Sequence, residues 1–360
     1  MKILMTLDAV GGVWQHAMDL AIGLRERGVS VVFAGLGPPP DADRLAAARS
    51  IGAVEWGDAP LDWLAGSQAE LAPVAPWLDR VAAHHAPDVM HLNLPTQAVG
   101  LTADLPILTM SHSCLATWFA AVRETDVPAD LAWQRHLTAQ GLGIADKIVA
   151  PSQAHAKALI RQYGRLSNLD VVPNSSRSMP SPGLRHARIV AVGRWWDDGK
   201  NGRMLDAAAA CSDWPVEMIG PLAGPDGAVL SLDHARQVGP LSHRETLRAI
   251  GRAGIFCAPS LYEPFGLAVL EAARAGVPLV LADIPTFREL WSDVAVFFDP
   301  DDPAFLADAL NEMARDPLRR ARLGCWAQDR ATRLNPDTQV DAMLDLYCQL
   351  ARTPVSTITG

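Results

Sequence analysis

The sequence has few cysteines and no long apolar run, and these absences exclude several classes of protein. Its five cysteines are odd in number, lie far apart and never form a Cys-x-x-Cys pair. A disulfide framework or a structural zinc site is therefore not expected, and a reducing compartment fits this usage. No stretch reaches the roughly 18 apolar residues of a membrane span, and the first apolar run turns polar at Asp8, too early for a signal peptide. We expect a cytoplasmic protein.

An excess of basic residues is also missing. The chain has 31 Lys and Arg residues against 40 Asp and Glu, a formal net charge of −9. A chain with excess negative charge does not favour nonspecific binding to nucleic acid, and no nucleic-acid partner is expected. Hydrophobic residues make up 49% of the 360-residue chain, which excludes a disordered protein or a fibre. This length suggests two domains of roughly 100–200 residues, although a single barrel stays open on length alone.

Short apolar runs alternate with longer segments of helical period, which predicts parallel α/β structure. Strands are expected at residues 2–6, 29–35, 89–92, 107–111, 147–150, 169–172, 188–192, 215–219, 255–258, 278–282 and 294–298. Helices are expected at 13–27, 131–144, 152–163, 202–211, 242–253, 266–275, 303–313 and 336–350, and residues 353–360 are expected to fray. Ser152 can cap one helix, and Ser242 with Glu245 forms a capping box for another.

A stretch rich in proline, serine and glycine, residues 173–187, is the best interdomain linker. It gives an N-terminal Rossmann-like domain at residues 1–173, a second at 174–335 and a C-terminal helix at 336–360. Two parallel α/β domains facing a central cleft would bring the carboxyl ends of both sheets to that cleft, where ligands of such sheets bind. Candidate site residues are therefore sought at strand ends.

In the first domain the candidates are Gly11, Gly12 and His112. The two glycines follow the first strand and lead into a helix, so backbone amides there can approach a ligand oxygen; a plain tight turn is the alternative. His112 follows a strand and could contact a ligand, although a lone histidine is more often structural. Neither a Gly-x-Gly-x-x-Gly fingerprint nor a Gly-x-Ser-x-Gly elbow is present, which disfavours a nicotinamide enzyme and a serine hydrolase.

In the second domain the candidates follow two strands. Arg194 and Lys200, six positions apart, could hold a pyrophosphate through a planar fork and a point charge, or could form surface ion pairs with nearby aspartates. Further on, a helix is expected to start near Gly266 and to offer free amides to a phosphate. Glu263 precedes this helix, and Glu271 lies inside it within an apolar run. A buried Glu271 would need partners such as ribose hydroxyls, whereas an exposed helix-face glutamate is the alternative.

These residues resemble the pattern of glycosyltransferase family 4, retaining enzymes of the GT-B fold. Its most specific part is the pair of glutamates with seven residues between them, here Glu263 and Glu271 around Pro264, Phe265, Gly266 and Leu267. The supporting segments, in order, are Gly11-Gly12, Pro87-Asp88-Val89-Met90-His91, Val172-Pro173-Asn174 and Val192-Gly193-Arg194 with Lys200. Departures are the linker text Val-Pro-Asn-Ser-Ser-Arg and the pair Trp195-Trp196, which we expect to pack under the loop rather than stack on a sugar.

The resemblance implies a donor site for a nucleotide-diphosphate sugar in the second domain, an acceptor side in the first domain, and a C-terminal helix at residues 336–360 that returns to the first domain. Glu271 would bind the ribose, Arg194 and Lys200 the diphosphate, and Glu263 the transferred sugar. His112 would face the reacting side of that sugar. The Gly11-Gly12 loop would close against phosphate and acceptor, and the amides in the segment of Phe265, Gly266 and Leu267 would bind the same phosphate or the sugar. The backbone of Gly239-Pro240-Leu241 would contact the nucleotide base. Retention could proceed by front-face attack, with the departing phosphate taking the proton of the acceptor hydroxyl.

The resemblance also sets the expected partners. No cofactor and no metal are expected beyond the donor, and the acceptor would be a sugar, a lipid-linked sugar or a small molecule in polysaccharide or glycoconjugate biosynthesis. Loops at 116–130 and 219–228 would shape that choice. An epimerase of the same fold and an inactive binding protein are the alternatives. One arginine-rich segment could make weak peripheral contact with the inner face of a membrane, or it could form a solvated helix face, and we favour the second. Its residues are Arg315, Arg319, Arg320, Arg322, Arg330 and Arg333.

Overall fold

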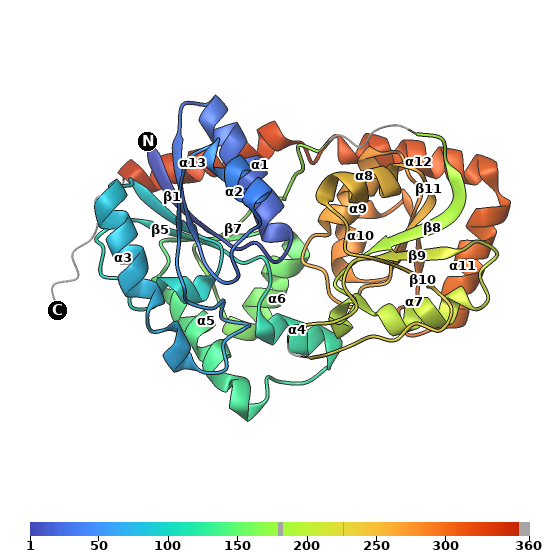
Figure 1. Ribbon diagram of the computed structural model, residues 1–360, viewed down its shortest axis with the longest axis horizontal. Helices are drawn as coiled ribbons and strands as arrows, with labels where there is room; N and C mark the ends of the chain where they lie inside the picture. The colour runs from blue at the N-terminus through green and yellow to red at the C-terminus, as the bar shows by residue number, and fades with distance from the viewer. Residues whose placement is uncertain (179–182, 226, 353–360) are drawn as a thin grey trace. The chain divides into compact units, whose positions relative to one another are not determined.

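The computed structural model describes residues 1–178, 183–225 and 227–352 (Figure 1). The expected fraying of residues 353–360 lies outside this range. The chain forms two compact units, each built around its own sheet. The first contains residues 1–120, 124–175 and the C-terminal helix, and the second contains 121–123 and 176–335. The expected linker therefore begins inside the first unit, where the amide and hydroxyl of Ser175 donate to Oε1 of Gln339 at 3.1 and 2.7 Å.

The first unit is a parallel sheet of seven strands in the order β3-β2-β1-β4-β5-β6-β7, counted over the described residues. The strands are β1 (Lys2–Leu7), β2 (Ser30–Gly35), β3 (Ala53–Trp56), β4 (Val89–Leu92), β5 (Ile107–Met110), β6 (Lys147–Ala150) and β7 (Leu169–Val171). Central strands such as β4 and β5 are buried along their whole length, as expected where helices cover both faces of a parallel sheet. The helices are α1 (Gly12–Glu26), α2 (Ala42–Arg49), α3 (Val74–His85), α4 (Leu115–Val122), α5 (Ala132–Ile144), α6 (Gln153–Tyr163) and α13 (Pro336–Arg352), with 3-10 turns η1 (Gln68–Leu71), η2 (Pro95–Ala98) and η3 (Ala129–Leu131).

The second unit is a parallel sheet of six strands in the order β10-β9-β8-β11-β12-β13 within the described ranges. The strands are β8 (His186–Val192), β9 (Val216–Ile219), β10 (Arg236–Gly239), β11 (Ala253–Ala258), β12 (Leu279–Ala282) and β13 (Ala295–Phe298). Its helices are α7 (Gly202–Ala209), α8 (His243–Gly251), α9 (Leu267–Arg274), α10 (Pro285–Trp291), α11 (Pro303–Arg315) and α12 (Pro317–Ala331), and η4 (Asp198–Lys200) is a 3-10 turn. In both sheets the chain order reverses at one strand, β1 or β8, which is the usual ligand position in doubly wound folds.

Most expected elements are confirmed, and the errors have a local cause. Ser152 caps α6 by accepting from the His155 amide, and Ser242 with Glu245 forms the capping box of α8. The segment 116–130, expected as a loop, contains α4 and η3 instead. The elements that were not expected are α2, β3, α3, α4, β10, α10 and α12. Helix α2 illustrates the reason, because only Ala48 is buried in it and it therefore has no apolar periodicity to detect.

Helix α13 belongs to the first unit and lies beside α1 (Figure 1). Its buried side chains, Val340, Met343, Leu346, Tyr347 and Leu350, share one hydrophobic core with α1 and β1. The Tyr347 hydroxyl lies 2.6 Å from Nδ1 of the buried His91 on β4. Buried apolar area and buried polar contacts, those of Tyr347 and of Gln339 with Ser175, therefore hold this helix in place.

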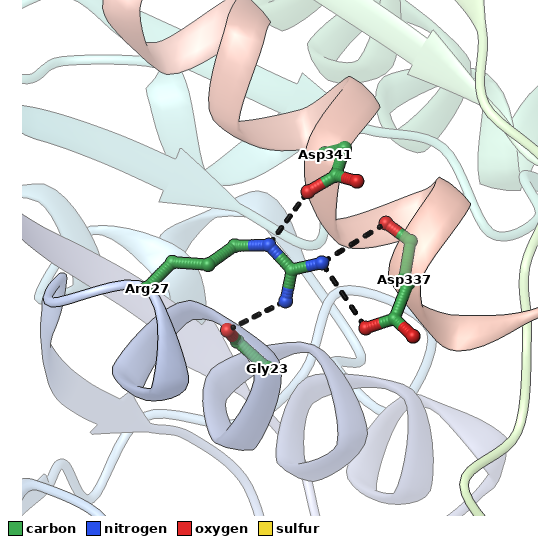
Figure 2. Close-up of polar contacts among 4 residues, drawn as sticks. All are labelled: Gly23, Arg27, Asp337 and Asp341. Atoms are coloured by element: carbon green, nitrogen blue, oxygen red, sulfur yellow. Dashed lines mark hydrogen bonds and ion pairs between the residues drawn. The ribbon is translucent and has the colours of Figure 1, made fainter.

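Ion pairs at the surface join the same two helices. Figure 2 shows Arg27 at the end of α1 between two aspartates of α13, with Nε 2.6 Å from Asp341 Oδ1 and Nη2 3.1 Å from Asp337 Oδ1. The remaining nitrogen, Nη1, donates to the Gly23 carbonyl at 3.2 Å. The two aspartate side chains are 63% and 76% exposed, so solvent screens these pairs.

We expect the buried contact to matter more than the surface pairs. Tyr347→Phe leaves Nδ1 of His91 without its hydroxyl partner and should lower the free energy of unfolding by about 1–3 kcal/mol. Arg27→Ala should lower the free energy of unfolding by no more than about 1 kcal/mol. Urea unfolding of both variants at neutral pH measures the difference. A larger loss for Arg27→Ala would mean that the surface pairs, and not the core, anchor α13.

Candidate active site

The loop after β8 carries the first two expected donor residues. Trp195 is 3% exposed, and its Nε1 donates to the Ile219 carbonyl at 3.0 Å, so it packs beneath the loop as expected. The Arg194 guanidinium carbon lies 5.5 Å from the centre of the Trp196 ring, and its Nη2 lies 3.7 Å from Asp197 Oδ2. The contact between Arg194 and Asp197 is the expected surface ion pair, although it is a long one. The planar guanidinium of Arg194 is a group suited to bind a phosphate.

Lys200 ends the same loop and meets a residue from a distant part of the chain. Its Nζ lies 2.5 Å from Oε2 of Glu263, and the two side chains are 18% and 20% exposed. Two backbone bonds hold the segments together, because the amides of Leu261 and Tyr262 donate to the Gly199 carbonyl at 2.9 and 3.3 Å. Strand β8 is the neighbour of β11 in the sheet, and this pairing places both loops at one edge.

Helix α9 begins immediately after this pair. Its N-cap is Gly266, which has φ +91°, and a Cβ there would lie 3.1 Å from a Phe287 ring carbon and 3.3 Å from Glu263 Cγ. The left-handed backbone therefore favours glycine, and the neighbouring side chains leave little room for a Cβ. No side chain caps this helix among the described residues. The amides near Leu267 are thus available to an anion at the positive end of the helix dipole.

Glu271 lies in the second turn of α9 and is 5% exposed. The alternative of an exposed helix-face glutamate is wrong. Its Oε1 lies 2.8 Å from Nε2 of His243, the first residue of α8. Sequence analysis missed His243, whose only signal was its place directly after the cap residue Ser242.

The remaining second-unit residues precede this histidine in the chain or belong to the core. Gly239 ends β10 with φ +81°, and its carbonyl accepts from the Gly220 amide at 2.9 Å. Leu241 packs partly against the core, two residues before His243. The Phe265 side chain is 3% exposed and belongs to the core, so only its backbone can face a ligand. All these segments follow strands of the same sheet at their carboxyl ends.

In the first unit, Gly11 and Gly12 form the start of α1. Gly11 is the N-cap, has an extended backbone with φ −145°, and makes no side-chain cap bond. The first turn of α1 carries no acidic residue. The loop before it is braced by the Val10 amide, which donates to Asp8 Oδ1 at 2.9 Å, and by Arg44, whose Nη1 donates to the Ala9 carbonyl at 2.9 Å. This helix start can therefore receive an anion or a hydroxyl at its amides.

His112 follows β5 and is held by a buried network. Its Nε2 lies 2.7 Å from Asn93 Oδ1, while Asn93 Nδ2 donates to the Thr6 carbonyl at 2.5 Å. Because a carbonyl can only accept, Asn93 must present its oxygen to the imidazole, so Nε2 of His112 carries the proton and Nδ1 the lone pair. Burial holds the pKa of His112 well below its usual range, and the neighbouring His16 and His91 lower it further. The ring is a neutral base near pH 7.

A hollow of about 570 Å³ opens in the same unit between η1, α3 and η2. Apolar side chains dominate its lining, and its polar members include Asp62, Thr96 and Gln97. Burial raises the pKa of Asp62, although Thr96 Oγ1 donates to its Oδ2 at 2.8 Å. The Thr6 hydroxyl donates to Gln97 Oε1 at 2.7 Å, and the Asn93 amide donates to the same hydroxyl at 2.8 Å. Polar contacts therefore connect this hollow to the residues that hold His112.

Three side chains of the arginine-rich segment contact other residues of the second unit. Arg315 Nε lies 2.8 Å from Asp213 Oδ2, and Arg319 Nη1 lies 3.2 Å from Glu312 Oε2. Arg320 lies over the Trp214 ring, with 4.7 Å between its guanidinium carbon and the ring centre. These contacts favour a structural role for the three arginines. Across residues 1–178, 183–225 and 227–352, none of the helices combines the length and the apolarity of a membrane span.

Comparisons with known proteins agree with this geometry. A model of glycosyltransferase family 4 matches residues 10–175, and a model of the glycosyl transferases group 1 matches residues 228–330. The chain is 28% identical to D-inositol 3-phosphate glycosyltransferase of Xylanimonas cellulosilytica, covering 74% of this chain and 72% of the relative. It is 26% identical to phosphatidyl-myo-inositol mannosyltransferase of Mycobacterium leprae, covering 88% and 87%.

A solved structure shows the same fold. HepE (Alr3699) of Anabaena, in complex with UDP-glucose, superposes with a TM-score of 0.78 at 19% identity, covering 97% of this chain and 100% of that one. The two parallel sheets and this likeness define a GT-B glycosyltransferase fold. A glycosyltransferase model matches in each of the two units, and the relatives are glycosyltransferases, so the chain is a glycosyltransferase and its class of reaction is the transfer of a sugar. Arg194 and Lys200 lie between the two matched ranges, and their assignment depends on the geometry given above.

Proposed function

We propose that this protein transfers a sugar from a nucleotide-diphosphate sugar to an acceptor hydroxyl, with retention and without a metal ion at the diphosphate. One observation carries the proposal. After the strands of the second sheet, Arg194, Lys200 and the start of α9 supply positive charge, while Glu263 contacts Lys200 and Glu271 lies in the second turn of α9 against His243. Such a set matches a ligand that has an anionic centre and hydroxyls at both ends.

The positive groups would stabilise the departing diphosphate. Cleavage of the sugar–phosphate bond leaves negative charge on the leaving oxygen, and preorganised cations and amides offset that charge without a metal. The Lys200 ammonium contacts the Glu263 carboxylate. A bound diphosphate would compete for this ammonium and release Glu263 to accept from hydroxyls of the sugar.

Retention follows if attack occurs on the face that the leaving group occupies. The acceptor oxygen bonds to the anomeric carbon as the bond to the phosphate oxygen breaks, and the acceptor proton passes to that phosphate oxygen. Glu263 is assigned to orient the sugar, because its contact with Lys200 favours a hydrogen-bond acceptor over a nucleophile. This route differs from that of retaining glycosidases, which use a second carboxylate as nucleophile.

The first unit would serve the acceptor. The neutral His112, with its lone pair on Nδ1, can accept from a hydroxyl near the reacting sugar, and the Gly11-Gly12 helix start can receive a phosphate or hydroxyl. The acceptor class stays a sugar, a lipid-linked sugar or a small molecule of a polysaccharide or glycoconjugate route. The names of the relatives make inositol phosphate and phosphatidylinositol the first acceptors to test, and the HepE complex makes UDP-glucose the first donor.

A thermal-shift screen with chelator present tests the donor class. UDP, GDP and ADP with their common sugar conjugates are offered to the purified protein. A ligand that binds only the native state should add about 2.7 kcal/mol of stability at a hundred times its Kd. A shift with one nucleotide and transfer to an acceptor support the proposal. Conversion of the donor sugar into its epimer would favour the epimerase, and no shift with any nucleotide would favour the inactive binding protein.

Glu271→Ala should chiefly weaken donor binding. The variant loses a charged hydrogen-bond acceptor at a buried ribose site, which costs about 1.5–3 kcal/mol of binding free energy. The Kd of the nucleotide is therefore expected to rise about 10- to 100-fold. Isothermal titration of the preferred nucleotide measures this change. Glu312→Ala on α11 removes a carboxylate whose side chain is 66% exposed and serves as the matched control. Equal affinities in the two variants would remove Glu271 from the site.

A further inference from the structure

Three side chains of the first unit meet on the side of α3 and β3. Glu55 lies on β3, and His84 and His85 are the last two residues of α3. One oxygen of Glu55 and one ring nitrogen of each histidine lie within 4.8 Å of one another. The pair of His85 Nε2 and Glu55 Oε1 is 3.0 Å apart. Sequence spacing could not reveal this group, because Glu55 precedes the histidines by a whole connection and helix.

The backbone explains why the three groups converge. β3 pairs with β2 and is the last strand in the sheet order. Helix α3 ends at His85 because Ala86 takes a left-handed backbone with φ +46°. The negative end of the α3 dipole therefore lies at the two histidines and favours a cation. The imidazole rings stand nearly perpendicular, at 84° with 4.6 Å between their centres.

The donor set selects a class of ion. Two imidazole nitrogens and one carboxylate oxygen suit Zn²⁺ and the neighbouring divalent transition metals, whereas Mg²⁺ and Ca²⁺ prefer oxygen ligands alone. The Glu55 side chain is 46% exposed and that of His85 is 16% exposed. Solvent can therefore reach the group and fill the remaining coordination position. One opposing charge is near, since Lys2 Nζ donates to the His85 carbonyl at 2.5 Å.

We propose that Glu55, His84 and His85 bind one divalent transition-metal ion, which joins the end of α3 to β3. The proposed sugar transfer uses none of these residues, so the two proposals stand or fall separately. The ion would replace the contact between Glu55 and His85 by two metal–ligand bonds and would add His84. Binding to the folded state alone would raise the thermal stability of the first unit.

Zinc titration of metal-stripped full-length protein tests the site. Calorimetry should give one Zn²⁺ per chain, and Zn²⁺ should raise the melting temperature while Mg²⁺ should not. His84→Ala and Glu55→Gln should each weaken Zn²⁺ at least about tenfold, or 1.4 kcal/mol, and abolish the shift. His84 is exposed, so its replacement should not disturb folding, which the metal-free melting temperature checks.

Two controls separate this site from other zinc ligands. His136→Ala removes an exposed histidine of α5 in the same unit, and the double change Cys211→Ser with Cys325→Ser removes the two exposed thiols. Both controls should bind Zn²⁺ like the parent chain. Undiminished Zn²⁺ binding in His84→Ala and Glu55→Gln, or binding lost in the cysteine control, would overturn the proposal. So would the absence of any Zn²⁺ binding to the parent chain.

Discussion

Lys200→Ala is expected to lower kcat for sugar transfer about 10²- to 10³-fold, because one preorganised group at the developing negative charge contributes that much. The ammonium is held at the edge of β8 by the Glu263 carboxylate. If its main interaction forms as the phosphate bond breaks, the loss should fall on kcat more than on KM. Steady-state rates with varied donor at saturating acceptor separate the two constants.

A second lysine provides the comparison for this experiment. Lys147 Nζ lies 2.8 Å from Asp170 Oδ2, with side chains 26% and 41% exposed, in the first unit. Lys147→Ala breaks a similar pair away from the proposed donor residues and should leave the rate unchanged. The double variant Lys200→Ala with Glu263→Gln avoids an unpaired carboxylate and shows whether the fold tolerates the loss. A Lys200→Ala enzyme with the parent kcat would exclude charge stabilisation by this residue.

Acidification is expected to destabilise the first unit before its carboxylates protonate. Burial lowers the pKa of His16 and His155 to about 4 and that of His91 to about 3. Below pH about 6.5 the unfolded chain takes up protons at these residues while the folded chain does not. The stability present above pH 6.5 is therefore lost as the pH falls toward 4. The loss should be about 2 kcal/mol for each histidine at pH 5.

Urea unfolding at pH 7.5 and pH 5.0, followed by circular dichroism, measures this loss. His155→Gln removes one buried titrating group, whose Nε2 lies 3.0 Å from Ser111 Oγ, and should recover part of the pH dependence. His136→Gln, at an exposed position of α5, should recover none. The same pH dependence in His155→Gln and the parent chain would show that the buried histidines do not control acid stability.

Local signals predicted the elements that bury an apolar face. Strands β4 and β6 have the expected bounds of residues 89–92 and 147–150 because continuous apolar runs mark buried parallel strands. Helix α8 was recognised by its capping box, although it ends at Gly251 and Ala253 already belongs to β11. Helix α12 was missed because arginines and other polar residues cover much of its surface. Periodicity is informative only where one face of an element is buried.

The chemical types at the candidate site could also be named in advance. Arg194, Lys200 and Glu263 were chosen because they follow strands and Glu271 because it lies inside a helix, and the structure places the first three in the segments after β8 and β11 and Glu271 in α9. Their contacts could not be derived from spacing. The partner of Lys200 is 63 residues away and that of Glu271 is 28 residues away, and each depends on which strands become neighbours.

The sequence alone determined the alternation of strands and helices, the caps of α6 and α8 and the glycine before α9, because hydrophobic periodicity and backbone preferences act over a few residues. Only the tertiary structure decided that Lys200 pairs with Glu263, that His243 meets Glu271 and that Glu55 reaches His84 and His85. These pairs arise from the sheet orders β10-β9-β8-β11-β12-β13 and β3-β2-β1-β4-β5-β6-β7. Strand order is set by the burial of the whole core, so no local segment of the chain contains it.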